Sequence, residues 1–258
     1  MKEVDFVPKR GEVIAVWFSC GAASAVAAKE TIRLYGDMCK IRVINNPVIE
    51  EDVDNQRFLK DVEQWLGLNI EFATNTKYPS CSAVDVWDDR NFMAGREGAP
   101  CTLELKKMAR RQWEAKNHVD WLVLGFTAEE SSRLERFRNF DTPNTLGVLI
   151  DQSITKGECF MRLQEAGIDL PAIYHRGYPN ANCIGCVKAT SPTYWNHVRQ
   201  QDPEIFKQRA EQSREIGARL VRYKNERIFL DELPPDARGH PMKNMDVECG
   251  IFCDSKYR

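Results

Sequence analysis

The chain lacks a surplus of charge of either sign, a long apolar run and any internal repeat. Its 258 residues carry 36 lysines and arginines against 38 aspartates and glutamates, so the net charge is only −2. Without a basic surplus, the electrostatic surface that binds nucleic acid is not expected. No stretch approaches the roughly 18 apolar residues of a membrane span, and the first residues lack the apolar run of a signal peptide. These absences predict a cytoplasmic protein with no membrane partner.

The cysteines do not suggest a disulfide framework, because there are nine of them and the expected compartment is reducing. Metal ligands, reactive thiols and core residues explain them more easily. We assign Cys39, Cys81 and Cys159 to the core. Cys183 and Cys186 form a C-x2-C pair, a spacing that lets both thiolates reach one metal centre.

Strand and helix patterns alternate along the first half of the chain. Short apolar, partly β-branched runs predict strands at 13–18, 41–44, 69–72 and 121–125. Helical patterns lie between them: an Ala-rich helix ending near residue 34, a helix over 54–66 and a helix over 102–116. This alternation predicts an α/β fold with a doubly wound, mostly parallel sheet that binds ligands at the carboxyl ends of its strands.

The alternation weakens after about residue 140. Thr155 and Glu158 fit a helix capping box, and Gly167 is well placed to end that helix. Asp202 followed by Pro203 predicts the start of a later polar helix. We therefore expect an α/β core over residues 1–150 and a cysteine-bearing region over 151–258 that packs on it.

The loop after the first strand is a candidate anion site. A strand that turns through small residues into a helix presents backbone N–H groups and the positive end of the helix dipole. Small residues at such a junction also serve close packing, and the loop alone leaves both roles open. The candidate nucleotide-binding residues of this loop are Ser19, Cys20, Gly21 and Ser24.

A second group of candidates follows the predicted strand at 121–125. Gly125 and Thr127 should lie at the same edge of the sheet as the first loop, because both segments follow parallel strands. Arg133 and Arg136 come next, and a guanidinium can bind a phosphate or sulfate through two hydrogen bonds. A solvated helix face with Glu–Arg pairs is the alternative for these arginines.

Four further marks follow one another along the chain: Ser19–Ser24, Cys101 with Lys106-Lys107, Leu170–Tyr178 leading to Cys183-x2-Cys186, and Glu248-Cys249-Gly250-Ile251. In these segments, taken in this order, the chain resembles the phosphoadenosine phosphosulfate and adenosine phosphosulfate reductases over most of its length. The resemblance implies an adenine nucleotide alpha hydrolase-like fold of the PP-loop superfamily. It also implies an oxidoreductase that binds a sulfated adenine nucleotide and transfers its sulfur group to a cysteine.

The resemblance assigns roles to the cysteines. Cys249 corresponds to the family's catalytic nucleophile, and Cys101, Cys183 and Cys186 stand where cluster-bearing relatives have ligands. A 4Fe-4S cluster takes four thiolates, so Cys249 or Cys253 would supply the fourth; with Cys249 as nucleophile, we assign Cys253. Zinc accepts the same ligands, and the resemblance favours iron. A thioredoxin-like protein or another thiol would release sulfite, and a homodimer is left open.

Departures from related patterns keep two other functions open. Related ATP pyrophosphatases carry S-G-G-x-D-S at the loop, where this chain has Cys20 and Ala23 in place of the first Gly and the Asp. Loss of that carboxylate argues against a magnesium-dependent ATP reaction. Phe252 replaces the histidine of the reductases. The alternatives are a sulfurtransferase that uses ATP to thiolate a nucleic acid or carrier, and a non-catalytic adenylate-binding metalloprotein.

Overall fold

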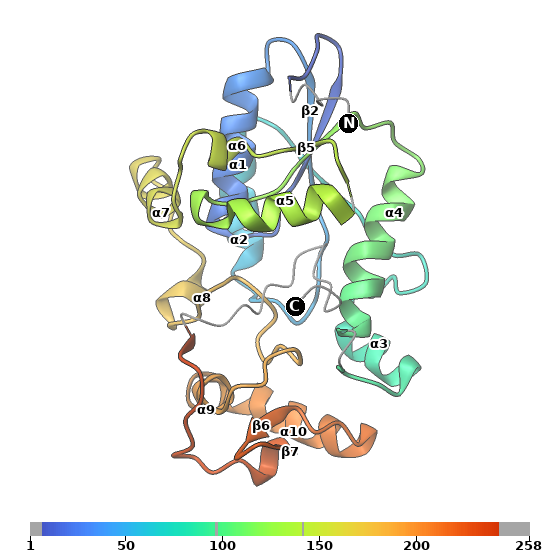
Figure 1. Cartoon of the computed structure of the whole chain (residues 1–258), viewed down its shortest axis with the longest axis vertical. Helices are drawn as coiled ribbons and strands as arrows, with labels where there is room; N and C mark the ends of the chain where they lie inside the picture. Colours follow the sequence, from blue (N-terminus) through green and yellow to red (C-terminus); the bar gives the residue numbers. More distant parts are fainter. Residues whose placement is uncertain (1–6, 96–97, 141, 243–258) are drawn as a thin grey trace. The chain divides into compact units, whose positions relative to one another are not determined.

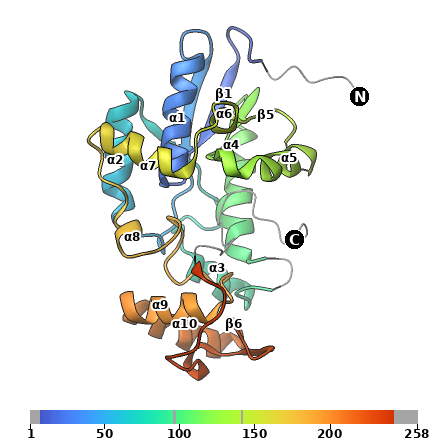
Figure 2. The same ribbon diagram turned by 60° about the vertical axis from the view of Figure 1, so that its left-hand side comes forward.

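A computed structural model describes residues 7–95, 98–140 and 142–242 (Figures 1 and 2). The chain divides into two compact units. Unit 1 contains the chain up to Pro47 together with Val53–Ala73 and Arg110–Ala172, and unit 2 contains Val48–Asp52, Thr74–Ala109 and the chain from Ile173. The chain thus passes between the units several times. The sequence predicts a single boundary near residue 150, and this division stays a prediction.

Unit 1 holds the parallel sheet. Its strands are β1 (Val13–Trp17), β2 (Lys40–Asn45), β3 (Ile70–Phe72), β4 (Trp121–Val123) and β5 (Thr145–Leu146). Its helices are α1 (Ala22–Tyr35), α2 (Asn55–Leu66), α4 (Ala109–Glu114), α5 (Ser131–Phe140), α6 (Val148–Asp151) and α7 (Lys156–Glu165). The four strands predicted from the sequence are confirmed with small changes at their ends, and β5 was not predicted.

The five described strands lie in the order β3-β2-β1-β4-β5, and every neighbouring pair is parallel. The predicted α/β class with a parallel sheet is therefore confirmed. From β1 the chain builds outward to β3 and then returns to the other side of β1 to form β4. Ligands of such sheets bind at the carboxyl ends of the strands where this reversal occurs, which here is the border of β1 and β4.

Helices cover both faces of the sheet, because Figures 1 and 2 show α1 and α4 on opposite sides of it. Trp113 of α4 packs edge-on against Trp17 of β1, with ring centres 5.6 Å apart. The Arg42 guanidinium lies 4.4 Å from the centre of the Trp113 ring, and its Nε donates a 2.7 Å hydrogen bond to Glu71 of the next strand. An arginine is thus tolerated on the covered face because its charge is paired and its planar group packs on an indole.

The predicted helix ends are confirmed where local chemistry specifies them. Gly67 follows α2 with a positive φ of 70°, which glycine adopts without the steric cost of a side chain. Thr155 and Glu158 form the reciprocal capping box at the start of α7, and Gly167 beyond its end has a φ of +71°.

Unit 2 is built mainly from helices. Its elements are α3 (Ala83–Arg90), the π-helical segment η1 (Thr102–Met108), α9 (Pro192–Gln201), α10 (Pro203–Ile216), the hairpin β6 (Val221–Tyr223) and β7 (Glu226–Ile228), and the 3-10 turn η3 (Leu230–Glu232). A short helix, α8 (Ala172–His175), begins at the end of unit 1. Thus the helix predicted over 102–116 consists of a π-helical half followed by α4. Helices α3 and α9 and the hairpin were not predicted from the sequence.

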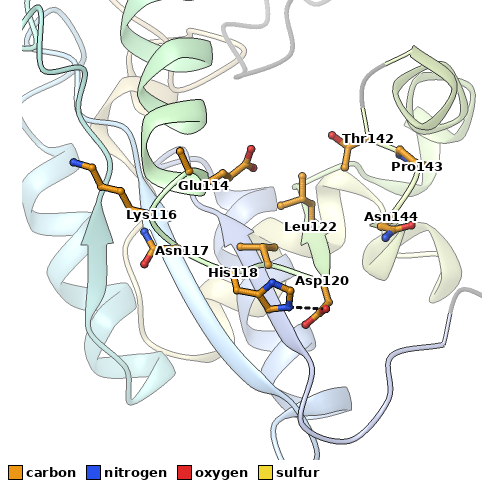
Figure 3. A pocket seen from close by; sticks show the side chains of 11 residues that line it. Glu114, Lys116, Asn117, His118, Asp120, Leu122, Thr142, Pro143 and Asn144 are labelled. Carbon is orange, nitrogen blue, oxygen red and sulfur yellow. Dashed lines mark hydrogen bonds and ion pairs between the residues drawn. The ribbon is translucent and has the colours of Figure 1, made fainter.

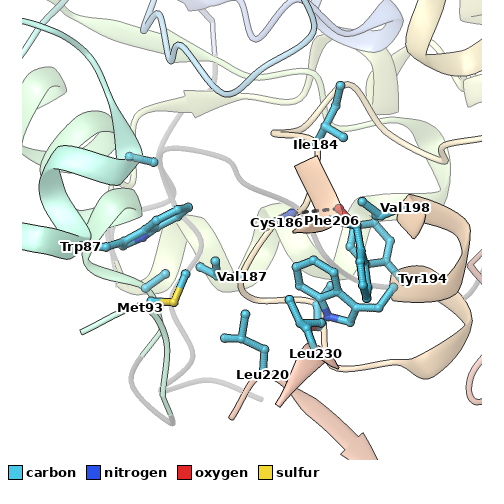
Figure 4. Packing of buried hydrophobic residues seen from close by; sticks show 14 of the residues in the cluster. Trp87, Met93, Ile184, Cys186, Val187, Tyr194, Val198, Phe206, Leu220 and Leu230 are labelled. Carbon is cyan, nitrogen blue, oxygen red and sulfur yellow. Dashed lines mark hydrogen bonds between the residues drawn. The ribbon is translucent and has the colours of Figure 1, made fainter. Parts of the chain in front are cut away.

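Aromatic and aliphatic side chains form the core of unit 2, and Figure 4 shows part of it. Trp195 is fully buried in this core. The Trp195 ring packs edge-on against Tyr194 and Phe206 at centre distances of 5.4 and 6.5 Å. Asp202 precedes α10 as predicted, but no described side-chain hydrogen bond caps the helix there. Its carboxylate instead accepts a 2.6 Å hydrogen bond from the Tyr178 hydroxyl.

In the described part of the chain, no helix is both long enough and apolar enough to cross a membrane. Two of the three cysteines assigned to the core are buried there, Cys159 completely and Cys39 to 8% exposure. The assignment of Cys81 to the core is wrong, because this residue is only partly buried and lies in the turn before α3.

Burial of Cys159 predicts a loss of stability at high pH. Burial raises the pKa of its thiol from 9.0 to about 12. The unfolded chain releases this proton above about pH 9 while the folded protein keeps it, so the stabilising contribution fades as pH rises from about 9 toward 12. Urea unfolding of wild-type protein and of Cys159→Ala should show a stability difference that shrinks between about pH 8 and 11. A constant difference would contradict this assignment.

Candidate functional site

The loop between β1 and α1 is held by hydrogen bonds among its own residues. The backbone N–H of Ser19 donates to Ser24 Oγ at 3.1 Å, and the two hydroxyl oxygens lie 3.2 Å apart. Ser24 Oγ donates to the Gly21 carbonyl at 2.9 Å. Gly21 is the N-cap of α1, and no side-chain hydrogen bond from the described residues caps this helix. The loop therefore presents an exposed serine hydroxyl beside a helix N-terminus.

Cys20 bends this loop through an uncommon backbone conformation. Its φ is +54°, a left-handed value that costs a non-glycine residue roughly 1–2 kcal/mol. The side chain is buried at 3% exposure. Asn45, at the end of β2, donates from Nδ2 to the Phe18 carbonyl at 2.9 Å and contacts Cys20 Sγ at 3.5 Å. The buried Asn45 amide thus anchors the strained part of the loop.

Gly125, just beyond β4, lies directly against the same loop. A Cβ atom at this position would meet the Ser24 nitrogen at 2.7 Å and its Cα at 2.9 Å. Real side chains do not approach backbone atoms this closely, so only glycine permits the contact. The end of β4 and the β1–α1 loop consequently form one continuous surface where the strand order reverses.

The other candidates after β4 have structural roles as well. Thr127 is buried, and its N–H and hydroxyl both bond Glu130 Oε2, at 3.0 and 3.3 Å, to start the turn before α5. The Arg133 guanidinium lies 5.0 Å from the Phe126 ring centre and is paired with Glu130 at 2.5 Å. Arg136 is an exposed residue of α5. Their role in nucleotide binding stays a prediction.

Lys156 lies near these candidates and was not predicted from the sequence. Lys156 is the first residue of α7, and its backbone N–H donates to Glu129 Oε1 at 3.3 Å. Burial lowers the pKa of its side chain, against the opposing effect of Glu130 and Glu129. The residues Thr155-Lys156-Gly157-Glu158 predicted a helix start. They did not show that Lys156 would contact Glu129, in the segment after β4.

In unit 2, the C-x2-C pair lies in a buried loop. Cys186 is 6% exposed and Cys183 is partly exposed. Both line a small cavity of about 20 Å³ together with Tyr178 and Tyr194. The Cys186 N–H donates to the Tyr194 hydroxyl at 2.9 Å, as Figure 4 shows. Burial raises the pKa of Tyr194 well above its usual value, and Cys186 adds to this shift. The phenol therefore stays neutral.

Cys101 belongs to the same surroundings. It precedes the π-helical segment η1. Burial lowers the pKa of Arg209 on α10, and Glu50, Cys183 and Cys101 oppose this shift. Within η1, Lys106 forms a nearly buried ion pair with Glu51 at 2.9 Å. Short π-helical segments occur frequently at functional sites. The structure therefore places Cys101, Cys183 and Cys186 in one unit, where Arg209 packs against Gly185, between the last two.

Two of the predicted thiol ligands, Cys183 and Cys186, share a cavity, and Cys101 lies in the same unit. Among the described residues, no three His, Cys, Asp or Glu side chains lie close enough together to form a metal-holding group. The predicted nucleophile Cys249 and the predicted fourth ligand Cys253 lie outside the described residues. The ligand assignments stay predictions.

A larger cavity, of about 600 Å³, opens at the opposite edge of the sheet (Figure 3). It is lined by Leu122 of β4 and by residues that precede β4 and β5, including His118 and Asp120, which share a 2.9 Å hydrogen bond. None of the predicted site residues lines it. Because ligands of parallel sheets bind at the carboxyl ends of strands, this cavity does not belong to the predicted nucleotide site.

No protein-family model matches this chain, and no curated protein sequence matches it. The functional assignment therefore rests on the residues and their geometry.

The anchoring role of Asn45 gives a direct test of the loop. Asn45→Ala leaves the buried Phe18 carbonyl without its 2.9 Å hydrogen bond and should lower the free energy of unfolding by about 1–3 kcal/mol. Asn144→Ala, at an exposed asparagine of the same unit, should change it by less than about 0.5 kcal/mol. Urea unfolding measures both, and equal effects would show that Asn45 does not hold the loop.

Proposed function

We propose that the protein is an adenylyl-sulfate reductase-like oxidoreductase of the PP-loop type. It binds a sulfated adenine nucleotide at the carboxyl edge of the unit 1 sheet and transfers the sulfur group to a cysteine. The observation that carries the proposal is the close contact of Gly125 with the loop at Ser24. This contact joins the loop that carries the resemblance to the segment after β4, which the sequence predicts at the same sheet edge, where the strand order reverses.

Anion binding follows from the residues on this edge. The Ser19 hydroxyl and the N-terminus of α1 offer hydrogen bonds and a positive partial charge to the phosphate groups. Arg133 supplies a guanidinium, packed on Phe126, that suits the oxygens of a sulfate. Ala23 provides no carboxylate for the magnesium ion of an ATP pyrophosphatase. The site therefore favours a sulfated adenylate over ATP.

The proposed reaction uses the thiolate of Cys249 as nucleophile. It attacks the sulfur of the sulfate group, so that a sulfur–sulfur bond forms, the bond from sulfur to the bridging oxygen breaks, and the nucleotide leaves with that electron pair. A thioredoxin-like dithiol then attacks the Cys249 sulfur and releases sulfite. The dithiol ends as a disulfide, and its two electrons account for the reduction of sulfate to sulfite.

The proposed metal centre is a 4Fe-4S cluster bound by Cys101, Cys183, Cys186 and Cys253. When bound, it would supply a fixed charge and a crosslink that ties the three thiol-bearing segments together. Zinc is the second candidate. It is favoured by the 20 Å³ cavity between Cys183 and Cys186, which matches a single ion better than a four-iron cluster.

The contact at Gly125 tests the nucleotide site. Gly125→Ala would place a Cβ 2.7 Å from the Ser24 nitrogen and push the loop away. We expect at least a tenfold loss of affinity for adenosine phosphosulfate, about 1.4 kcal/mol, and a parallel loss of sulfite production. Gly157→Ala is the matched control, because its Cβ would meet nothing closer than 3.9 Å. Calorimetry showing equal affinity for both variants would place the nucleotide elsewhere.

The metal assignment is tested by anaerobic purification. The protein should carry iron and acid-labile sulfide, and Cys183→Ser or Cys186→Ser should remove both. Cys81→Ser, at a partly exposed thiol of the same unit that is outside the proposed ligand set, should keep both. Stoichiometric zinc without labile sulfide would replace the cluster by the second candidate.

A further inference from the structure

The exposed face of the β6–β7 hairpin carries two arginines directly opposite each other. The two strands are antiparallel, and their register places Arg222 of β6 against Arg227 of β7. Both arginines are exposed, whereas Val221, next to Arg222 in β6, is fully buried in the core of unit 2. Like charges directly opposite each other in a hairpin destabilise it. This arginine pair therefore does not serve the stability of the fold.

The backbone pattern brings the two arginine side chains close together. The Arg222 N–H donates to the Thr190 carbonyl at 2.9 Å and is not directed at β7. In antiparallel strands, opposite residues that do not bond each other have the closest side chains. Partial burial lowers the pKa of Arg227, and the charge of Arg222 adds to this shift. Arg227 Nη1 donates to the Leu220 carbonyl at 2.8 Å, so its guanidinium stays near the start of β6.

Two more cations lie beside this pair. Arg219 comes shortly before β6, and Lys224 lies in the turn of the hairpin; both are exposed. The Arg219 guanidinium is 5.3 Å from the centre of the Phe229 ring, and Lys224 Nζ is 5.1 Å from the centre of the Tyr223 ring. Positive charge is thus combined with aromatic rings. The basic hairpin surface consists of Arg219, Arg222, Lys224 and Arg227.

Acidic side chains do not neutralise the basic hairpin surface. In the part of the chain that the structure describes, none of its four cations forms an ion pair. Asp231 and Glu232 pair with Arg214 of α10 instead, at 2.9 and 2.8 Å. Glu226 lies opposite Tyr223, and hence on the other face of the hairpin from the arginine pair. The net charge of −2, from which no nucleic-acid surface was expected, averages over the whole chain and conceals this local surplus.

We propose that the basic hairpin surface binds nucleic acid through its phosphate backbone. A guanidinium binds a phosphate through two hydrogen bonds, and neighbouring arginines can bind successive phosphates of one strand. A two-stranded ribbon fits the major groove of a duplex, and the partly exposed Tyr223 and Phe229 rings can stack on unpaired bases. Among the described residues, no exposed large hydrophobic side chain lies in this hairpin. The surface therefore lacks the apolar groups that insert into a lipid bilayer.

Reversal of one charge tests the inference, because it should affect stability and binding differently. Arg222→Glu turns the like-charge pair into an opposite-charge pair, which should keep or raise the melting temperature. It should weaken the binding of a labelled oligonucleotide by about tenfold, and the slope of log affinity against log salt should become shallower by about one. Lys60→Glu, at an exposed lysine of α2, changes the net charge equally and should leave the affinity close to wild type.

Fluorescence anisotropy with the full chain measures the affinity for a single strand and for a duplex of the same sequence, at several salt concentrations. Circular dichroism gives the melting temperatures. Binding of neither probe at low salt would overturn the inference, and so would equal weakening by Arg222→Glu and Lys60→Glu. Tighter binding of polyglutamate than of both probes would overturn it in favour of an acidic protein.

Arg222→Gln covers the case in which Arg222→Glu does not fold. It removes the charge without reversing it, so it should weaken binding without lowering the melting temperature. Unchanged affinity in this variant would overturn the inference. The inference does not depend on the reductase reaction or on the metal centre, because none of these measurements involves sulfite, a sulfated nucleotide or a metal.

Discussion

The functional account of unit 1 depends on one close backbone contact, between Gly125 and the loop at Ser24. The added Cβ at 2.7 Å from the Ser24 nitrogen leaves no room for any side chain. The contact fixes the end of β4 against the β1–α1 loop, while Asn45 holds the other side of that loop. The exposed Ser19 hydroxyl and the N-terminus of α1 are thus presented from an edge held by these contacts. Such preorganisation limits the entropy lost when a charged ligand binds.

In unit 2, by contrast, charged side chains are buried. Lys106 pairs with Glu51, and Arg209 lies behind the C-x2-C loop with Glu50 nearby. A purely hydrophobic core would be at least as stable, because desolvated charges rarely add stability. The position of Arg209 beside Gly185 of the C-x2-C loop is understandable if the neighbouring thiols become thiolates on binding a metal. The same buried charges would only destabilise a core in which the cysteines serve packing alone.

Local patterns predicted much of the fold. The apolar runs gave the strands, and Gly67 and Thr155 marked helix ends through chemistry that acts within a few residues. The contact of Gly125 with Ser24 depends on strand order, and no short-range pattern encodes that order. The sequence predicted a polar helix that contains Arg209. The burial of this residue depends on tertiary contacts, which the sequence pattern does not show. The turn at Cys81 and helix α3 were missed because their apolar residues show no clear period.

The candidate site was predicted in parts. The loop and the C-x2-C pair were found from residue types and spacing, and Cys101 was found only through resemblance to the reductases. Asn45, Lys156 and Arg209 were not found, since each acts through neighbours far away in the sequence. Positioning residues of this kind show no motif, because their role depends on the packing around them.

The most direct test of the central claim is the mass of the intact protein after a single turnover with adenosine phosphosulfate in the absence of thiols. The account predicts that wild-type protein gains the mass of one sulfonate group, located on Cys249, with release of one adenosine monophosphate. Addition of a dithiol should then remove this mass and yield sulfite. An unmodified wild-type protein that consumes ATP instead would contradict the account, and so would a Cys249→Ser variant that still gains the sulfonate.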